Sequence, residues 1–279
     1  MVDLDLIRRA LAEDLAGGQD ITSVATVSGS ESVVADFVSR KAGVIAGVEM
    51  AVATVREVGI TDIQVHLNDG DAVAPGSVVM TVRGDTRAIL LAERTALNFL
   101  GHLGGIATLT NTWVKAIAGT ECTIRDTRKT TPGMRLLEKA AVVAGGGVNH
   151  RLSLSESALI KDNHIAAAGG VSAAFAKVRA AFPDAFIEIE VDSIDQLKEV
   201  AAQSPNLVLL DNMTPAQCKE AVAFVAGRFK LEASGGISLE NALAYAQSGV
   251  DYLAIGALTH SAPVLERPSF PCIQRNMPR

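Results

Sequence analysis

The chain contains 279 residues, of which 48% are hydrophobic and 20% charged, and its formal net charge is −6 at pH 7. This length and apolar content predict a folded chain with a sizeable core and exclude disorder as its main state. The acidic balance argues against a general nucleic-acid-binding surface, and the lack of a run of about 18 apolar residues argues against a membrane span.

Two further features favour a cytoplasmic location. The three cysteines, Cys122, Cys218 and Cys272, lie far apart and lack the spacing of zinc ligands or of a disulfide framework. Such cysteines are typical of a reducing compartment. The first residues, MVDLDLIRRALAEDL, carry acidic side chains where a signal peptide would carry basic ones, so we expect a helix of the mature protein there.

The N-terminal third mixes helical and strand-like patterns. Residues 3–15 have helical spacing and end at a Gly-Gly pair, and residues 50–58 favour a second helix. Short apolar runs broken by turn residues predict strands at 32–40, 44–46, 63–67 and 77–83. A long helical stretch follows over 86–118, which we expect Gly101, Gly104 and Gly105 to interrupt. These elements predict a small α+β unit.

From residue 120 onward, short apolar runs alternate with helical patterns. The expected strands cover 122–125, 158–161, 186–191, 207–210, 230–234 and 252–255. The expected helices cover 133–143, 170–181, 194–202, 215–227 and 239–247. This alternation predicts parallel strands joined by right-handed crossovers. Six repeats favour an incomplete or small α/β barrel, with an open doubly wound sheet as the alternative.

Polar, charged or glycine residues stand at the end of every expected strand in this region. Because the carboxyl ends of parallel strands surround the active site of such folds, these residues predict a site there. Alternation along 187–191 places Glu188 and Glu190 on the face opposite the apolar residues, and the same parity assigns Lys161 and Asp211 to the interior. An interior network of ion pairs without a ligand is the structural alternative.

Charge is distributed unevenly around these strand ends. Residues 125–161 contain seven basic and three acidic residues, a local balance of +4 in an acidic chain. The last two strands end in Ser234-Gly235-Gly236 and Ile255-Gly256-Ala257, and glycine lets backbone N–H groups approach a phosphate. A cationic zone, carboxylates and glycine amides together suit a substrate with several negative groups and a phosphorylated sugar.

Ten segments, in order from residue 13 to residue 261, strongly resemble quinolinate phosphoribosyltransferases. They are EDLAGGQDITS (13–23), KAGVIAG (41–47), AERTALNFLGHLGGIAT (92–108), IRDTRKTTPGMR (124–135), GGGVNHR (145–151), LIKDNHI (159–165), IEVDS (189–193), LLDNMT (209–214), SGGIS (234–238) and GVDYLAIGALTHS (249–261). Because the resemblance follows the order of the family over most of the chain, it is far more specific than any single motif.

The resemblance implies a fold, a reaction and an assembly. It implies an N-terminal α/β sandwich domain over 1–108 and an incomplete six-stranded α/β barrel over 109–264, with a tail at 265–279 that receives no role. The family converts quinolinate and phosphoribosyl pyrophosphate into nicotinate mononucleotide, pyrophosphate and CO₂ for NAD biosynthesis. Mg²⁺ is the implied cofactor, and a homodimer, or a higher oligomer built from it, is the implied assembly, without nucleic acid or membrane partners.

The resemblance also implies the site residues. Arg128, His150, Arg151 and Lys161 would hold the quinolinate carboxylates near Thr127, and Arg94 would reach the site of the neighbouring subunit. Lys129 would contact pyrophosphate, and Glu190 and Asp211 the ribose hydroxyls or Mg²⁺. The 5′-phosphate would bind at Ser234, Gly235, Gly236, Ile255, Gly256 and Ala257. Lys129, Lys161, Glu190 and Asp211 are the implied catalytic residues.

Two departures from the family pattern leave alternatives open. Ala140 and Val143 stand where the family commonly has Tyr and Arg, and LSLSES (152–157) resembles a related pyrophosphorylase encoded with molybdate transporters. That relative would use another pyridine or anionic acceptor, but the intact NHR and KDNH strings favour the quinolinate enzyme. Two alternatives from other classes are a barrel without catalytic activity that senses phosphorylated metabolites and a purely structural protein. Neither would require all the charged site residues implied by the resemblance, and all of them are present in this sequence.

Overall fold

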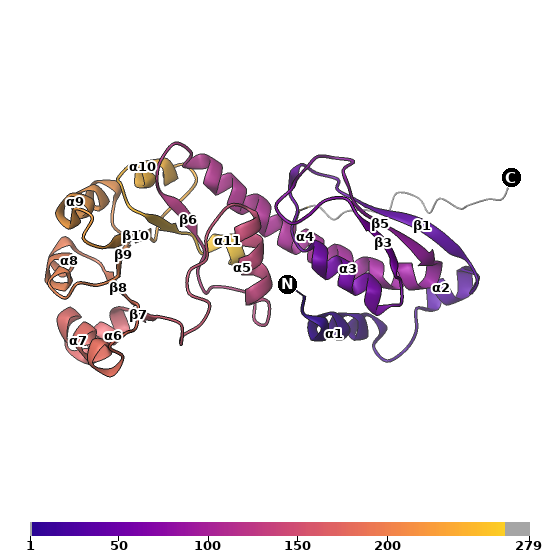
Figure 1. Ribbon diagram of the computed structural model, residues 1–279, viewed down its shortest axis with the longest axis horizontal. Helices are drawn as coiled ribbons and strands as arrows, with labels where there is room; N and C mark the ends of the chain where they lie inside the picture. Colours follow the sequence, from indigo (N-terminus) through magenta and orange to yellow (C-terminus); the bar gives the residue numbers. More distant parts are fainter. Residues whose placement is uncertain (1, 266–279) are drawn as a thin grey trace. The chain divides into compact units, whose positions relative to one another are not determined.

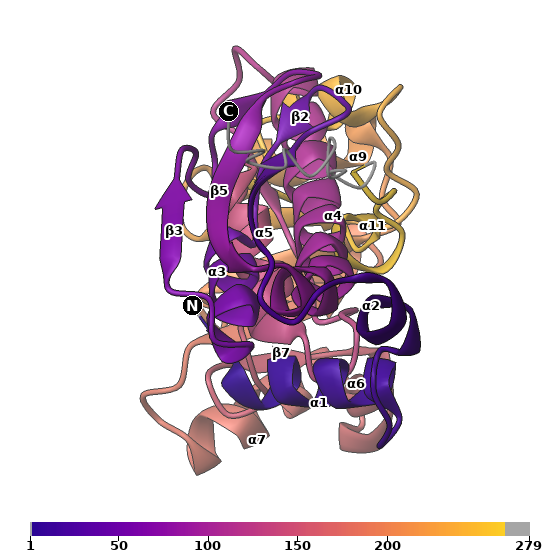
Figure 2. The same cartoon turned by 90° about the vertical axis from the view of Figure 1, so that its right-hand side faces the viewer.

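The computed structural model describes residues 2–265 (Figures 1 and 2). Its described residues form two compact units, one comprising 2–111, 136–146 and 261–265 and the other 112–135 and 147–260. The domain boundaries expected at 108 and 264 stay a prediction. The expected tail lies, apart from residue 265, outside the described residues, and so does Cys272.

The first unit is built on a three-stranded antiparallel sheet in the order β1-β5-β3, with a separate two-stranded sheet of β2 and β4. The strands are β1 (Ser32–Val38), β2 (Gly43–Val44), β3 (Asp62–Val65), β4 (Ala72–Val73) and β5 (Val78–Asp85). The helices are α1 (Leu4–Leu15), α2 (Ile21–Thr26), α3 (Val48–Glu57), α4 (Thr86–Ala116) and α5 (Arg135–Ala144). The predicted small α+β unit is confirmed, whereas the antiparallel pairing of its strands, α2 and β4 were not predicted.

The core of the first unit lies between the sheet and two helices. Phe37 from β1, Met80 from β5, Val55 from α3 and Leu97 from α4 belong to one buried apolar cluster. Each of these side chains exposes 1% of its surface or less. The periodicities of the strands and helices therefore converge on a shared core.

The interruption predicted at the three glycines of α4 is wrong, because the helix runs unbroken from Thr86 to Ala116. Gly105 lies so close to the backbone of Pro263 that a Cβ there would overlap the Pro263 carbonyl oxygen. This glycine is therefore explained by close backbone packing on one face of the helix, at a propensity cost of about 1 kcal/mol relative to alanine.

The second unit contains one six-stranded sheet in the order β6-β11-β10-β9-β8-β7, in which every pairing is parallel. The strands are β6 (Thr123–Arg125), β7 (Ala158–Ile160), β8 (Ile187–Val191), β9 (Leu207–Asp211), β10 (Lys230–Ser234) and β11 (Tyr252–Ala254). The six predicted parallel strands are confirmed. The edge strands β6 and β7 do not pair with each other within the described residues, so the barrel is incomplete.

From β7 onward, each strand of this sheet is followed by one or two helices. They are α6 (Asp162–Ala168), α7 (Val171–Ala181), α8 (Ile194–Ala201), α9 (Pro215–Val225), α10 (Ala242–Ala246) and α11 (Ala257–His260). Sequence patterns did not predict the short helices α6 and α11. Ile187, Ile189 and Val191 of β8 are buried, which leaves Glu188 and Glu190 on the other face, as the alternation indicates.

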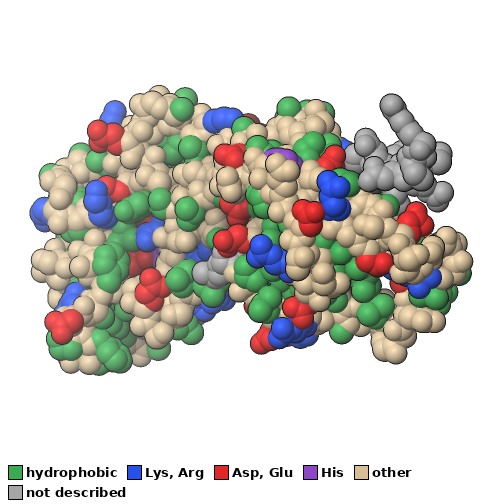
Figure 3. Space-filling model, turned by 45° about the vertical axis from the view of Figure 1, so that its right-hand side comes forward, with side chains coloured by type: hydrophobic (Ala, Val, Ile, Leu, Met, Phe, Trp, Pro, Cys, Tyr) green, Lys and Arg blue, Asp and Glu red, His purple; other side chains and the backbone are tan. Residues whose placement is uncertain are grey.

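On the face shown in Figure 3, acidic and basic side chains are interspersed. Within residues 2–265, each helix is either too short or too polar to cross a bilayer.

Candidate active site

The cationic part of the site is built where residue 148 joins the edge strand β6. Val148 forms a parallel bridge with Arg125, and its N–H donates to the carbonyl of Ile124 at 2.9 Å. The fully buried Asp126 then accepts the backbone N–H of His150 at 2.8 Å. These bonds hold the segment after residue 148 beside the loop after β6, although the two are more than 20 residues apart in sequence.

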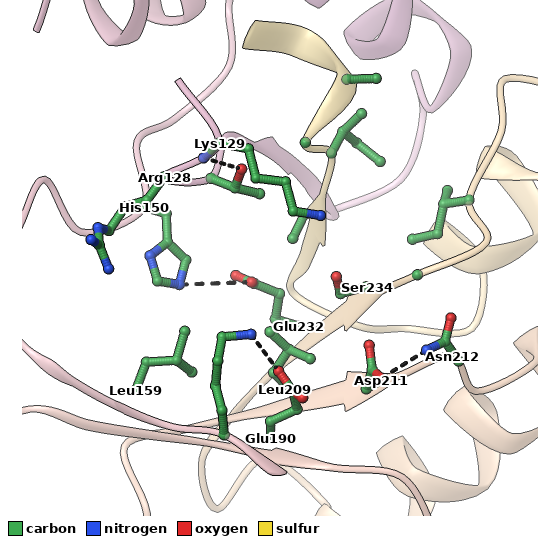
Figure 4. A pocket seen from close by; sticks show the side chains of 18 of the residues that line it. Arg128, Lys129, His150, Leu159, Glu190, Leu209, Asp211, Asn212, Glu232 and Ser234 are labelled. Atoms are coloured by element: carbon green, nitrogen blue, oxygen red, sulfur yellow. Dashed lines mark hydrogen bonds and ion pairs between the residues drawn. The ribbon is translucent and has the colours of Figure 1, made fainter. Parts of the chain in front are cut away.

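The carboxyl ends of the six strands enclose a pocket of about 770 Å³ (Figure 4). Fourteen of the fifteen predicted site residues line it, namely Thr127, Arg128, Lys129, His150, Arg151, Lys161, Glu190, Asp211, Ser234, Gly235, Gly236, Ile255, Gly256 and Ala257. Arg94 is exposed on α4 and is not among the residues that line this pocket. The structure therefore brings the cationic, acidic and glycine-bearing zones into one cavity.

Two guanidinium groups give the pocket its positive zone. The Nε atoms of Arg128 and Arg151 are buried, and neither has a hydrogen-bond partner in the described part of the chain. Arg151 is fixed by a bond from its Nη1 to the carbonyl of Ser157 at 2.6 Å. Burial, and then the nearby charge of Arg128, lowers the pKa of Arg151. An anion placed between these groups would satisfy the free N–H donors and offset the repulsion of the two charges.

The acidic zone lies at the ends of the neighbouring strands β8 and β9. Lys161 Nζ is 2.8 Å from Glu190 Oε2, and Asn212 Nδ2 donates to Asp211 Oδ2 at 2.7 Å. The register places Ser234 opposite Asp211, at the end of β10. The pocket thus offers carboxylate oxygens that can accept hydroxyl groups or bind a hard cation.

A buried network beside these zones contains Glu232, a residue that sequence reasoning missed. Glu232 lines the pocket, is 0% exposed and accepts Arg125 Nη1 at 2.8 Å. His150 Nε2 is 2.7 Å from Glu188 Oε2. The same nitrogen is 3.9 Å from Glu232 Oε1, the contact drawn in Figure 4. Burial, and then the charge of Glu188, raises the pKa of Glu232 to about 7. Since Ser234 points into the pocket, the period of two along β10 could have identified Glu232.

This network also decides what His150 can contact. Its Nδ1 accepts the backbone N–H of Arg151 at 2.8 Å, which leaves Nε2 as the protonated nitrogen that donates to Glu188. His150 is therefore assigned as a neutral imidazole with both ring nitrogens bonded to protein. The ligand atoms of His150, Glu188 and Glu232 lie within 4.8 Å of one another, a spacing that a metal ion could use only if it displaced that proton.

Glycine is required at two positions of the remaining zone. Gly235 has φ of +86°, and a Cβ there would overlap the side-chain amide of Asn212. A Cβ at Gly256 would lie 3.0 Å from Lys129 Cδ, so the absence of a side chain leaves room for the lysine. Both glycines line the pocket.

Comparison with known proteins identifies the family of the chain. Residues 20–104 match the model of the N-terminal domain of quinolinate phosphoribosyl transferase, and residues 106–266 match that of its C-terminal domain. The chain belongs to the quinolinate phosphoribosyltransferase family. It is 51% identical to the nicotinate-nucleotide pyrophosphorylase (carboxylating) of Mycobacterium leprae, with 94% of each chain covered. It is 39% identical to a quinolinate phosphoribosyltransferase (decarboxylating) of Nicotiana tabacum, over 94% of this chain and 80% of that one.

Solved structures of this family share the whole fold. NadC from Streptococcus pyogenes matches with a TM-score of 0.92 and 37% identity, and the alignment covers 96% of this chain and 95% of that one. The nicotinate-nucleotide pyrophosphorylase of Francisella tularensis matches with a TM-score of 0.90 and 36% identity, over 95% of both chains. These matches confirm the predicted family and fold class of the chain.

Proposed function

We propose that this chain transfers the phosphoribosyl group of phosphoribosyl pyrophosphate to quinolinate with loss of CO₂. The products are nicotinate mononucleotide and pyrophosphate, which makes the chain a pentosyltransferase of NAD biosynthesis. Membership of the family supports the reaction, and one observation in the pocket supports the substrate. The buried, unpartnered Nε atoms of Arg128 and Arg151 are donors suited to a planar carboxylate.

We assign the carboxylates of quinolinate to the cationic zone. Arg128 and Arg151 would bind them through their free N–H groups, and Lys161, half-exposed beside Glu190, would add a third charge. His150 would contact a carboxylate only by exchanging one of its two bonds to protein for the substrate. Its expected role is therefore to hold Arg151 through the backbone bond to Nδ1.

The phosphoribosyl pyrophosphate would occupy the remaining walls of the pocket. Lys129 would contact the pyrophosphate, and Glu190 and Asp211 would accept the ribose hydroxyl groups. The 5′-phosphate would bind the backbone of the two glycine-bearing strand ends, at 234–236 and 255–257. Both segments line the same cavity as the cationic zone, which supports the binding of two anions side by side.

Mg²⁺ fits the chemistry of the acidic zone. Glu190 and Asp211 offer carboxylate oxygens, the ligands that Mg²⁺ prefers, and each already accepts a donor that a cation could replace. We propose that these two residues hold the ion together with the pyrophosphate of the substrate. The bound ion would neutralise charge on the leaving group.

The reaction requires positioning more than strong acid or base chemistry. The pyridine nitrogen of quinolinate attacks the anomeric carbon as pyrophosphate leaves, and the resulting pyridinium can accept the electron pair released when the adjacent carboxylate departs as CO₂. The residues of the pocket must align two anions and offset their repulsion. Catalysis by orientation and electrostatic stabilisation suits this task.

We further propose that the enzyme works as a cytoplasmic homodimer. The resemblance to the family implies that Arg94, which is exposed on α4, acts in the site of a second copy. Cys122 and Cys218 are buried free thiols, and burial raises their pKa values to about 12 and about 11. Such unreactive thiols suit a reducing compartment.

A product assay tests the proposed reaction. The purified protein is mixed with Mg²⁺, phosphoribosyl pyrophosphate and either quinolinate or nicotinate, and CO₂ and nicotinate mononucleotide are measured. We expect both products with quinolinate. Turnover of another pyridine acceptor without CO₂ would favour the molybdate-linked relative, and ligand binding without any turnover would favour a sensor.

A further inference from the structure

The buried network beside His150 has one positive charge too few. Glu188 and Glu232 are 1% and 0% exposed, and one oxygen of each, Oε1, lacks a hydrogen-bond partner among residues 2–265. Arg125 reaches from β6 to Glu232, and its guanidinium stacks on the Tyr252 ring at 4.6 Å from the centroid. His150 adds no charge in the tautomer that its two bonds require. Two carboxylates therefore share one direct cationic partner.

The other groups around Glu232 do not supply the missing charge. Its register partners are Leu209 on β9 and Tyr252 on β11, neither of which is cationic. Arg151 interacts electrostatically with Glu188 but makes no ion pair with either carboxylate among those found in the described residues. Because two carboxylates buried this close repel each other when both are ionised, burial and the charge of Glu188 favour the protonated form of Glu232.

The reaction needs a proton in this pocket. When CO₂ leaves the pyridinium intermediate, the electron pair of the broken C–C bond stays on the ring carbon C2. That carbon must gain a proton to give nicotinate mononucleotide. An acid that faces the substrate, carries its proton at neutral pH and becomes an anion afterwards would complete the step.

We propose that Glu232 is this acid: its carboxyl proton passes from Oε1 to C2 as CO₂ departs, and the carboxylate left behind is held by Arg125. The proposal rests on the function proposed above. The C2–CO₂ bond breaks, the C2–H bond forms with the retained electron pair, and Glu232 recovers its proton from water after the product leaves. Glu232 is the fully buried carboxylate among the described residues of the pocket wall, and its free oxygen is the one nearer His150.

Two observations favour Glu232 over its neighbours. Its pKa, raised to about 7 chiefly by burial, is matched to proton transfer near neutral pH. Glu190 and Lys161 are already engaged with each other in an ion pair at 2.8 Å. His150 already donates its single ring proton to Glu188.

The test separates the two halves of the reaction. Wild type and Glu232→Gln are mixed in a single turnover with phosphoribosyl pyrophosphate, Mg²⁺ and quinolinate labelled in the 2-carboxyl group. Pyrophosphate and labelled CO₂ are measured separately. We expect pyrophosphate formation to change less than about 3-fold, while CO₂ and nicotinate mononucleotide form at least about 100-fold more slowly, the range of lost general acid catalysis.

Glu232→Asp is the matched control, because it restores an acidic proton at a shorter reach. Glu232→Asp should therefore release CO₂ faster than Glu232→Gln does. Its rate of pyrophosphate formation should be the same as that of Glu232→Gln. Equal losses in both halves for Glu232→Gln would make Glu232 a binding or structural residue and overturn the proposal, as would unchanged rates in both. Circular dichroism establishes that each variant is folded. A wild-type protein that forms neither product would instead overturn the proposed function itself.

Discussion

Arg128 and Arg151 place two guanidinium groups in one pocket, and the Nε atom of each has no hydrogen-bond partner among the described residues. If these groups bind the quinolinate carboxylates, removing one of them should weaken substrate binding. Arg128→Ala should lower kcat/KM for quinolinate at least about 30-fold, since truncating one partner of a buried charge pair costs about 2–5 kcal/mol. Arg128→Lys keeps the charge but loses the planar guanidinium group, so its kcat/KM should lie between those of wild type and Arg128→Ala. Steady-state kinetics measure both, and an unchanged kcat/KM for Arg128→Ala would remove the carboxylate clamp from the mechanism.

Glu232 predicts a pH dependence of stability. Its pKa in the folded protein is raised from 4.5 to about 7, so the folded state binds this proton more tightly than the unfolded state. The resulting stabilisation is complete below pH 4.5 and is lost as pH rises through about 7. Urea unfolding from pH 5 to 8 should show the free energy of unfolding of wild type falling relative to Glu232→Gln. A constant difference across this range would mean that the proton is not bound there.

Individual site residues were predictable where a short-range pattern carries them. Alternation along β8 identified Glu188 and Glu190, and the charges after β6 identified Arg128. The same alternation applied to β10 would have identified Glu232. The orientation of His150 was beyond such reasoning, because it depends on the bridge between Val148 and Arg125 and on the buried Asp126, contacts that form only in the folded chain.

At the scale of elements, α4 shows how packing overrides local propensity. Gly105→Ala would normally favour a helix by about 1 kcal/mol. Here its Cβ would overlap the carbonyl oxygen of Pro263 and lie 3.0 Å from the backbone N of Leu265, so we expect a net loss of about 1–3 kcal/mol and a lower Tm. Thermal unfolding measures the change, and a raised Tm would contradict this account of the glycine.

Gly104→Ala is the matched control on the same helix. Its Cβ would lie 3.0 Å from Leu265 Cδ2, the end of a flexible side chain that can move away. We expect a Tm close to that of wild type, or slightly above it because alanine favours the helix. A fall as large as that of Gly105→Ala would show that both glycines are fixed by the same backbone contact.

Over the whole molecule, patterns local in sequence predicted the six parallel strands and the small α+β unit before them. The strands were identified because a buried parallel strand is a short apolar run between turn residues. The grouping of residues 136–146 with the first unit was not apparent from sequence, since α5 stands between two segments of the second unit. Contacts between distant segments, such as that of Thr259 Oγ1 with the carbonyl of Lys129 at 2.9 Å, leave no local pattern.

The proposed sharing of Arg94 between subunits predicts complementation. Arg94→Ala and Lys161→Ala should each be nearly inactive. If Arg94 acts in the site of the partner, each mixed dimer contains one intact site of two, so the purified mixed dimers should show about half of the wild-type activity. The variants are co-expressed with different tags, purified through both, and assayed for CO₂ release. The control pairs Lys161→Ala with Glu190→Ala. Because both residues line the same pocket of one chain, each site of this mixed dimer lacks one of them, and no recovery is expected. If the Arg94 and Lys161 variants show no recovery although mixed dimers form, Arg94 serves its own chain.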